Sequence, residues 1–294
     1  MKKIVIGIVA LIILVIVILA ASSKDQETQT SNSTSGITLQ DAHGLAVDRK
    51  DSSKVYIATH TGLLAMSNDA ELQRVSDAQD DYMGFSAHPT DANIFYSSGH
   101  PSGGGNIGFQ KSTDGGKTWQ KVANGVGGPV DFHTMTASQA DPNIIYGVYR
   151  GQLQRSSDEG KNWELVNAAN IGNIITLATD AASKDTLYAG TTNGLYVSQD
   201  RGSNWSKAGG LDGAVTAVSV NTTDSKTIVA YADGQGLMKS NDGGTSWTNL
   251  KGYTGNMAMQ LAVDTQNTST LYLINQSLEI HKTTDSGDTW KKVR

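Results

Sequence analysis

The hydrophobic positions of this chain follow two different patterns. Residues 4 to 21 form one uninterrupted apolar run, whereas from about residue 41 onward short apolar runs alternate with turn residues. One such stretch, between residues 174 and 208, reads IITLATD, DTLYAGTT, GLYVSQD and WSKA. These runs are rich in β-branched and aromatic residues and lack a helical period, so they predict four short β-strands.

This four-strand pattern returns with a nearly fixed period. The string S/T-x-D-x-G-x-x-W occurs five times, and its last position holds all five tryptophans of the chain, at intervals of 44, 42, 42 and 43 residues. A sixth copy, SNDAELQR at residues 67–74, keeps the serine and the aspartate but lacks the glycine and the tryptophan. Units of ~40–45 residues with four strands are typical of β-propeller blades. We therefore predict an all-β fold, a single six-bladed β-propeller over residues 36–294.

The repeated string lies between the third and fourth strands of each unit, where a hairpin is expected. Its aspartate can accept hydrogen bonds from the backbone of the turn, its hydroxyl can close the hairpin, and its glycine supplies a positive φ. One carboxylate per copy is too few for calcium, which takes six to eight oxygen ligands. We therefore expect a structural role for the aspartates of the string: Asp69, Asp114, Asp158, Asp200, Asp242 and Asp285.

These strings resemble the Asp-box, or bacterial neuraminidase repeat, of sialidase-type propellers. Similar boxes occur in xyloglucanase-type glycosidases, in sortilin-type receptors and in the photosystem II assembly-factor propeller. The resemblance covers all six units and implies the propeller fold with Asp-box hairpins. It does not imply one activity, because these families share the box and differ in function.

The resemblance allows two enzyme classes to be compared with the residues. A sialidase would need three arginines that hold a carboxylate, with a tyrosine nucleophile and a glutamate. Of the six arginines in the chain only Arg150 maps to the propeller mouth, which argues against a typical sialidase. Xyloglucanase-like enzymes use a cleft between two propellers, whereas this chain is predicted to form a single propeller and so lacks that cleft. A glycosidase-type hydrolase acting on extracellular glycans remains the alternative to a binding function.

Candidate site residues appear when the six units are aligned on their first strands. Just before that strand, the first three units carry Asp41, Asp81 and Asp131, and two of them add His43 and His133. After the second strand the same three units place His60, His100 and Arg150, the last preceded by Tyr149. Both positions belong to one mouth of the ring, where propellers usually bind ligands. A glycine-rich insertion in unit 2, GHPSGGGNIG, lies beside that mouth and could act as a lid or clamp.

Several roles are open for these residues. The four histidines His43, His60, His100 and His133 could bind a divalent metal ion, with the aspartates as ligands or as partners of the ligands. The aspartates could instead be catalytic, as an acid/base pair acting on a sugar. His60, His100, Tyr149 and Arg150 could contact a ligand directly. The alternative is that all these side chains hydrogen-bond the loops and line a wet channel. His88 and His281 map elsewhere and are expected to be solvent or packing residues.

The N-terminal segment and the composition indicate where the propeller works. Lysines at positions 2 and 3 precede the apolar run, which as a helix would span roughly 27 Å, so residues 1–21 are predicted to be a transmembrane signal anchor. A cleaved signal, which would yield a secreted protein, is the alternative. Residues 22–35 are polar and predict a flexible tether. We therefore expect a single-pass membrane protein with its propeller outside the cell.

Charge and cysteine content narrow the set of partners. The formal net charge of −5 argues against nucleic acid as a partner. The chain has no cysteine, which excludes disulfides, thiolate metal sites and cysteine nucleophiles. We expect a monomer that binds an extracellular glycan or protein partner, with a divalent metal as the only cofactor under consideration.

Overall fold

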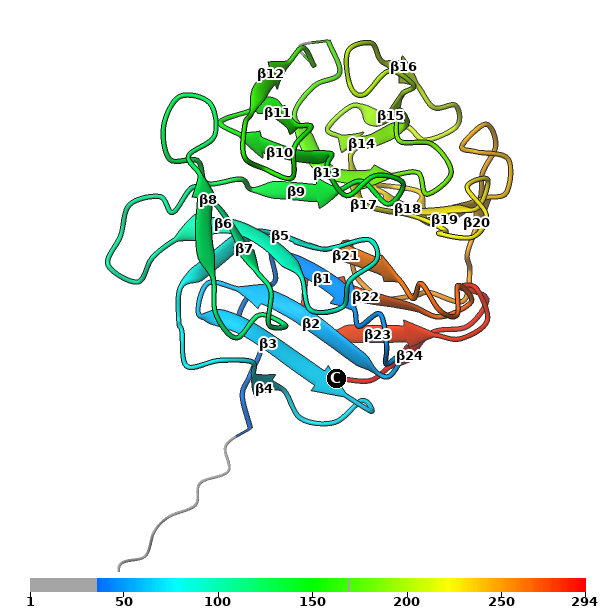
Figure 1. Ribbon diagram of the computed structural model, residues 1–294. Helices are drawn as coiled ribbons and strands as arrows, with labels where there is room; N and C mark the ends of the chain where they lie inside the picture. Colours follow the sequence, from blue (N-terminus) through cyan, green and yellow to red (C-terminus); the bar gives the residue numbers. More distant parts are fainter. Residues whose placement is uncertain (1–35, 169) are drawn as a thin grey trace, which may run out of the picture. The chain divides into compact units, whose positions relative to one another are not determined.

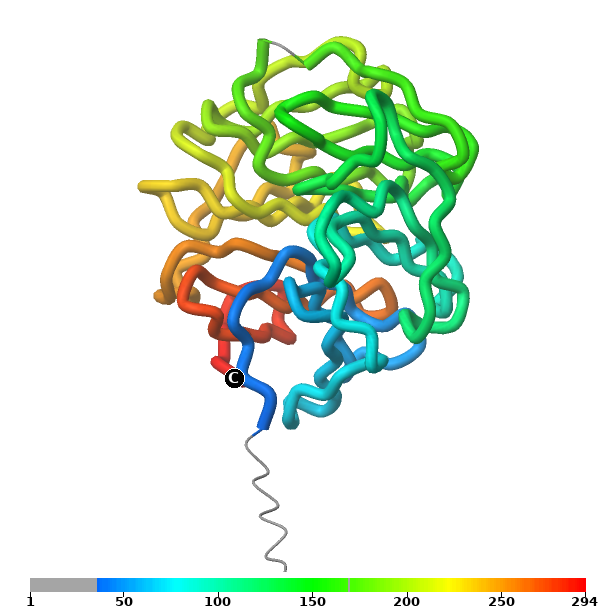
Figure 2. The backbone as a smooth tube through the Cα atoms, turned by 90° about the vertical axis from the view of Figure 1, so that its left-hand side faces the viewer, coloured from blue at the N-terminus to red at the C-terminus, as the bar shows by residue number. Residues whose placement is uncertain are grey.

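The computed structural model describes residues 36–168 and 170–294. Ile37–Arg294 forms a compact unit. Its strands build six four-stranded antiparallel sheets, each from four strands that are consecutive in the sequence. The sheets follow one another around a central channel, so that the first and last sheets are neighbours (Figure 1 and Figure 2). The predicted six-bladed propeller is confirmed.

The four strands of each blade have distinct positions in the ring. The innermost strands line the channel: β1 (Gly44–Val47), β5 (Asp81–Ala87), β9 (Thr134–Ala137), β13 (Ile174–Thr179), β17 (Val215–Val220) and β21 (Ala258–Val263). The second strands are β2 (Lys54–Thr59), β6 (Phe95–His100), β10 (Ile145–Tyr149), β14 (Leu187–Thr191), β18 (Ile228–Ala232) and β22 (Leu271–Asn275). The third strands are β3 (Gly62–Ser67), β7 (Phe109–Ser112), β11 (Gln152–Ser156), β15 (Gly194–Ser198), β19 (Gly236–Ser240) and β23 (Ile280–Thr283). The outermost strands are β4 (Gln73–Arg74), β8 (Gln120–Ala123), β12 (Glu164–Val166), β16 (Ser206–Lys207), β20 (Thr248–Asn249) and β24 (Lys291–Lys292).

The hydrophobic core lies between the blades. Six apolar clusters are present among the described residues, and each joins two adjacent blades. The second strands pack against neighbouring blades on both faces, so every residue of β14 and β22 is buried, whereas the outermost β16 and β24 are exposed. This explains why the second strands read as nearly continuous apolar runs.

The ring closes through side chains of blades 6 and 1. The Tyr272 hydroxyl donates to the carbonyl of Ser52 at 3.1 Å, and the Arg294 guanidinium donates to the carbonyl of Ile37 at 2.8 Å. Leu39 is buried in the apolar cluster shared by the two blades. Residues 37–40 form no strand, so closure uses contacts rather than an added strand.

The Asp-box forms the hairpin turn expected from its residues. In blade 3, Asp158 Oδ1 accepts from the Ser156 hydroxyl at 2.9 Å and from the Asn162 backbone N–H at 2.8 Å. Gly160 has a φ of 84° and its N–H donates to the Ser156 hydroxyl at 2.8 Å. The Trp163 indole donates to the Gly160 carbonyl at 2.9 Å. The same aspartate-centred turn is present at Asp114, Asp200, Asp242 and Asp285.

Each Asp-box also docks onto other parts of the ring. The Glu159 N–H donates to the Asn143 carbonyl in the loop between β9 and β10, at 2.9 Å. Gly160 packs against the ring of Phe109 in the preceding blade, where a side chain would not fit. The eroded box of blade 1 differs, because Asp69 pairs with Lys282 of blade 6 at 3.5 Å. The boxes therefore link strands and blades, at the end of the ring opposite the turns between second and third strands.

The Asp-box carboxylates predict a loss of stability in acid. Hydrogen bonds from Asn204 lower the pKa of Asp200 to about 2, and those from Ser246 lower the pKa of Asp242 to about 2. A depressed pKa adds stability that is fully present above the unfolded value of about 3.9 and is lost as the pH falls toward 2. We expect Tm, measured by differential scanning fluorimetry, to fall between pH 4 and pH 2.

A double variant provides the control for this prediction. Asp200→Asn with Asp242→Asn should lower Tm at pH 7 and should make the fall between pH 4 and pH 2 smaller than in the wild type. A pH dependence identical to that of the wild type would show that these carboxylates do not contribute.

The predicted signal anchor (residues 1–21) and tether (residues 22–35) lie outside the described residues. Within residues 36–168 and 170–294, no helix has the length and apolar character needed to cross a membrane. The membrane anchor therefore stays a prediction from the sequence.

Candidate functional site

The candidate residues of blades 1 to 3 lie at one mouth of the channel because of where the strands begin and end. Innermost strands start at this mouth and second strands finish there. Three aspartates lie just before or at the start of an innermost strand: Asp41, Asp81 and Asp131. Two histidines, His43 and His133, directly precede an innermost strand. Two more, His60 and His100, lie just after or at the end of a second strand. The antiparallel register therefore brings all seven to the same end of the ring.

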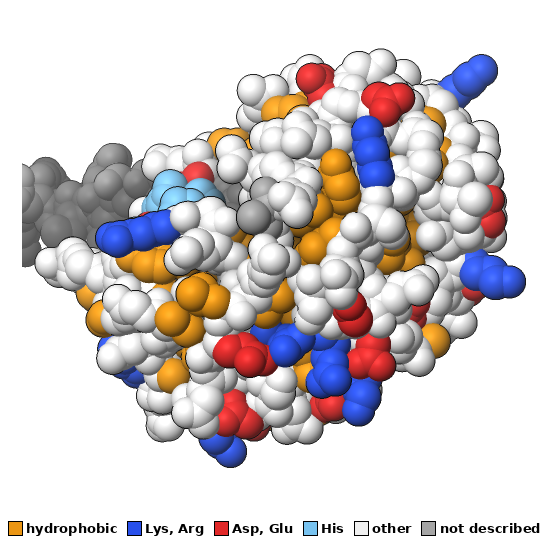
Figure 3. All heavy atoms as spheres, turned by 90° about the horizontal axis from the view of Figure 1, so that it is seen from above, with side chains coloured by type: hydrophobic (Ala, Val, Ile, Leu, Met, Phe, Trp, Pro, Cys, Tyr) orange, Lys and Arg blue, Asp and Glu red, His pale blue; other side chains and the backbone are white. Residues whose placement is uncertain are grey.

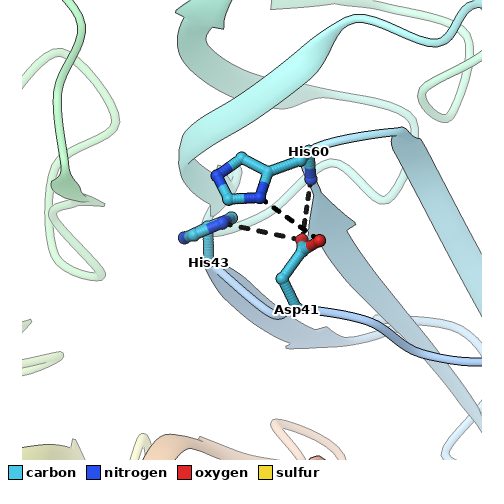
Figure 4. Close-up of side chains that lie close together, drawn as sticks. All are labelled: Asp41, His43 and His60. Carbon is cyan, nitrogen blue, oxygen red and sulfur yellow. Dashed lines mark hydrogen bonds and ion pairs between the residues drawn. The ribbon is translucent and has the colours of Figure 1, made fainter.

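Asp41 connects two histidines within blade 1 (Figure 4). Its Oδ1 lies 3.6 Å from Nε2 of His43, and its Oδ2 lies 3.3 Å from Nδ1 of His60. The backbone N–H of His60 donates to Asp41 Oδ1 at 2.7 Å and fixes the carboxylate. The centroids of the two imidazole rings are 4.1 Å apart. These three residues form a compact group whose ligand atoms lie within 4.8 Å of one another.

Asp131 connects two histidines across blades 2 and 3. Its Oδ2 lies 3.1 Å from Nε2 of His100 and 3.1 Å from Nε2 of His133. The side chain of Asp131 is 5% exposed, whereas that of His133 is 66% exposed. A buried carboxylate therefore holds two rings that face the solvent at the mouth.

Asp81 lies between these two groups. Its Oδ2 is 3.8 Å from Nε2 of His60 in blade 1, and its backbone is directly paired with His100 in the β5–β6 ladder. Histidine and aspartate thus alternate across three adjacent blades. The four histidines, which could have formed one ligand set, lie in two pairs: His100 and His133 share Asp131, while His43 and His60 share Asp41.

The surroundings shift the pKa of three members of the cluster. Burial lowers the pKa of His43, and the nearby His60 ring lowers it further. Burial raises the pKa of Asp81 above the ordinary aspartate value. The hydrogen bond to the Gly105 carbonyl raises the pKa of His100. His43 therefore takes up a proton less readily than a free imidazole, and His100 takes one up more readily.

Three buried polar atoms of the cluster are left without a hydrogen bond. His43 Nε2, Asp81 Oδ1 and Asp131 Oδ1 find no hydrogen-bond partner among the described residues. Buried polar atoms are satisfied in the large majority of cases, so these three atoms are available for hydrogen bonds or ligation at the mouth.

The glycine-rich segment of blade 2 is fixed beside this mouth. The carbonyl of Gly105 lies 2.7 Å from Nδ1 of His100, and the Asn106 amide donates to the Tyr149 hydroxyl at 3.0 Å. The Arg150 guanidinium lies 5.0 Å from the centroid of the Tyr149 ring and is exposed. Asn106 was not among the sequence candidates, although it lies in a segment expected to border the mouth. Movement of this segment as a lid stays a prediction.

The other three blades present a different arrangement at this end. In blade 5 the N–H of Asp233 donates to the carbonyl of Ala214 at 2.8 Å, and in blade 6 the N–H of Gln276 donates to the carbonyl of Met257 at 2.8 Å. A main-chain carbonyl thus takes the place that the Asp41 carboxylate has in blade 1. The ionisable cluster is therefore a property of blades 1 to 3.

The mouth opens into a central channel. The channel cavity is about 190 Å³ and is lined by the innermost strands of the ring. His43 and His133 lie at the end that carries the cluster, while Arg49 and Gln139, which follow β1 and β9, line the opposite end. In the view of Figure 3, histidine side chains form a single group on the surface, with an acidic side chain beside them.

The remaining histidines and arginines have structural contacts. His88 Nδ1 accepts from the backbone N–H of Asp91 at 3.0 Å in the loop after β5, as a packing residue would. Arg155 pairs with Glu164 at 2.6 Å, and Arg201 pairs with Asp185 at 3.0 Å, both in the outer hairpins. Arg150 follows β10 at the mouth, and Arg74 donates to the carbonyl of Thr61 in the turn between β2 and β3 at the same end of the ring.

Comparison with known proteins supports the fold. A family model described as the DUF6242 beta propeller domain matches residues 90–218. A search of curated proteins gives no match. Among solved structures, the chain is similar to the GH74 enzyme from Niastella koreensis, with 19% identity, a TM-score of 0.57, and coverage of 85% of this chain and 46% of that one. The chain spans about half or less of the length of the GH74 enzymes it matches.

Two other similarities extend over most of both chains. YCF48 bound to D1 peptide has 16% identity and a TM-score of 0.53, with coverage of 87% of this chain and 84% of that one. A chain of the nidogen/laminin complex has 11% identity and a TM-score of 0.61, with coverage of 81% of this chain and 91% of that one. At these identities the likenesses show the fold alone.

Proposed function

We propose that this propeller is a binding module that recognises a polypeptide segment of a partner protein at the mouth of blades 1 to 3. The observation that carries the proposal is the alternation of four histidines and three aspartates across three adjacent blades, beside a fixed glycine-rich segment. The proposal also follows the sequence expectation of a tethered propeller outside the cell, where a membrane anchor would raise the local concentration of nearby partners.

The exposed part of the mouth suits recognition of a polar segment. The side chains of His60, His100 and His133 are 49%, 38% and 66% exposed. The aspartates behind them orient the rings and leave imidazole edges toward the solvent. Arg150 adds an exposed guanidinium, whose planar fork suits a carboxylate of the partner.

Two considerations favour binding over glycoside hydrolysis. Asp41 and Asp131 each contact two histidine rings, so neither is a free carboxylate facing a scissile bond. The similar peptide-bound YCF48 matches along most of its chain, whereas the similar GH74 enzymes match over about half of theirs or less. Hydrolysis of an extracellular glycan is the second candidate, supported by the partly buried Asp81, whose raised pKa suits a general acid.

Selection from a random peptide library tests the proposal. The library, displayed on phage, would be panned against the propeller (residues 36–294), and selected peptides would be measured by titration calorimetry. We expect His100→Ala and Arg150→Ala each to weaken binding about tenfold or more, as for central interface residues. Lys117→Ala, at an exposed Asp-box position on the opposite end, should leave binding unchanged.

The outcomes of this experiment separate the candidate functions. Absence of enriched peptides, or peptides insensitive to both mouth variants, would overturn the peptide-binding proposal. Incubation of the same protein with a panel of soluble polysaccharides, followed by measurement of released reducing ends, tests the second candidate. Release that is abolished in Asp81→Asn would favour the hydrolase.

A further inference from the structure

We propose that Asp41, His43 and His60 bind one divalent transition-metal ion, with Zn²⁺ as the expected species. Two imidazole nitrogens and a carboxylate are a ligand set that suits zinc and its neighbours in the first transition row. Such sites take a water molecule or an external ligand at the remaining position. This inference goes beyond partner binding and its test needs no partner.

The spacing of the ligand atoms supports a tetrahedral site. Two ligands that are each ~2.0–2.1 Å from zinc, at the tetrahedral angle, lie roughly 3.4 Å apart. Asp41 approaches the two imidazole nitrogens with different oxygens, Oδ1 at 3.6 Å from His43 and Oδ2 at 3.3 Å from His60, and one ligand atom from each residue lies within 4.8 Å of the others. The three side chains also point toward a common space at the mouth (Figure 4). A shift of these side chains toward that space would place all three ligands around one metal ion.

The hydrogen bonds around the three residues leave their ligand atoms available. His43 Nε2 is buried and has no hydrogen-bond partner among the described residues, so its lone pair or proton is unused. Asp41 Oδ1 is held by the His60 backbone N–H at 2.7 Å, and Asp41 Oδ2 faces Nδ1 of His60 at 3.3 Å. A metal ion would satisfy the buried imidazole and leave the carboxylate fixed in position.

A carboxylate also lies behind one of the proposed ligands. Nε2 of His60 is 3.8 Å from Asp81 Oδ2, on the side of the ring away from Asp41. Metal-binding histidines usually give their other ring nitrogen to a carboxylate, which orients the ring and increases its basicity. Asp81 is therefore a positioning residue for the metal site, and it comes from the neighbouring blade.

The second histidine group is less suited to a metal. Both His100 and His133 approach one oxygen, Oδ2 of Asp131, each at 3.1 Å. This group does not bring three ligand residues within mutual reach. His133 is for that reason the matched control, because it is also a mouth histidine paired with an aspartate.

Zinc titration of chelator-treated propeller (residues 36–294) tests the site. Isothermal titration calorimetry and elemental analysis after dialysis should give one Zn²⁺ per chain, with a Kd in the micromolar range or tighter. We expect His43→Ala to weaken binding about 100-fold or more, and Asp81→Asn to weaken it roughly tenfold. His133→Ala should change the Kd less than about threefold. Mg²⁺ should bind far more weakly, because it prefers all-oxygen sites.

Thermal unfolding provides an independent readout of the same site. Zn²⁺ that binds only the folded state raises Tm in the wild type and in His133→Ala, and should not do so in His43→Ala. Should His43→Ala fail to fold, His60→Ala replaces it, since that side chain is half exposed. Absence of zinc binding in the wild type would overturn the proposal. Equal loss in His43→Ala and His133→Ala would also overturn it, because the two groups would then act as one.

Discussion

Replacement of Phe132 by alanine is expected to lower the free energy of unfolding by about 3–5 kcal/mol. The ring of Phe132 is fully buried between blades 2 and 3, with its centroid 4.8 Å from that of Trp163. It also fills the space above Gly147, where an added Cβ would overlap the ring. The truncation therefore removes apolar contacts and leaves a cavity that the surrounding sheets cannot close.

Chemical denaturation measures this effect, and Tm should fall by roughly 6–20 °C. Val122→Ala is the control, because Val122 is an apolar residue that is 37% exposed, and it should change stability by less than about 1 kcal/mol. A cost below about 1 kcal/mol for Phe132→Ala would contradict the assignment of this ring to the core. Because Phe132 lies between Asp131 and His133, the variant should also perturb the mouth.

Replacement of Gly99 by alanine is expected to cost about 2–5 kcal/mol of stability. Gly99 has a φ of 150° and pairs with Tyr82, where the β5–β6 register shifts. A Cβ at this position would overlap the carbonyl oxygen of Asp81. The two strands must therefore move apart, and the adjacent pair of Asp81 with His100 moves with them.

Gly103→Ala is the matched control, because a Cβ on Gly103 would meet no atom within 4 Å. It lies in the same glycine-rich segment and should change stability by no more than about 0.5 kcal/mol. Denaturation curves give the two stabilities, and the imidazole resonances of His60 and His100 report on the mouth. Equal stability of the two variants would show that close packing at Gly99 is not required.

Local contacts explain why the sequence predicted the Asp-box turns. In blade 3 the bonds of Asp158 reach only Ser156 and Asn162, which are two and four residues away. The hydrogen bonds inside the turn come from neighbouring residues, whereas the docking of the turn onto Phe109 of the preceding blade does not. The regular spacing of the tryptophans then indicated the number of blades, because every blade has a hairpin at this position.

The sequence pattern did not predict the contacts between blades. The alignment of repeats placed seven histidines and aspartates at one mouth, but it gave no distances between blades. The pairing of His60 with Asp81 and of His100 with Asp131 crosses a blade boundary in each case. Closure of the ring through Tyr272 and Arg294 likewise joins residues more than 200 positions apart.

By itself the sequence determined the all-β class, the number of blades, the position of the hairpins and the end of the ring at which the histidines and aspartates lie. These features depend on side-chain periodicity and on hydrogen bonds between residues that are close in the sequence, so the order of residues is enough to predict them. Only the tertiary structure decided that the four histidines divide into two groups, that Asp81 lies beside His60, and that Asn106 reaches Tyr149. Such contacts depend on the spacing and tilt between adjacent blades, which packing of the apolar clusters sets and no local pattern encodes.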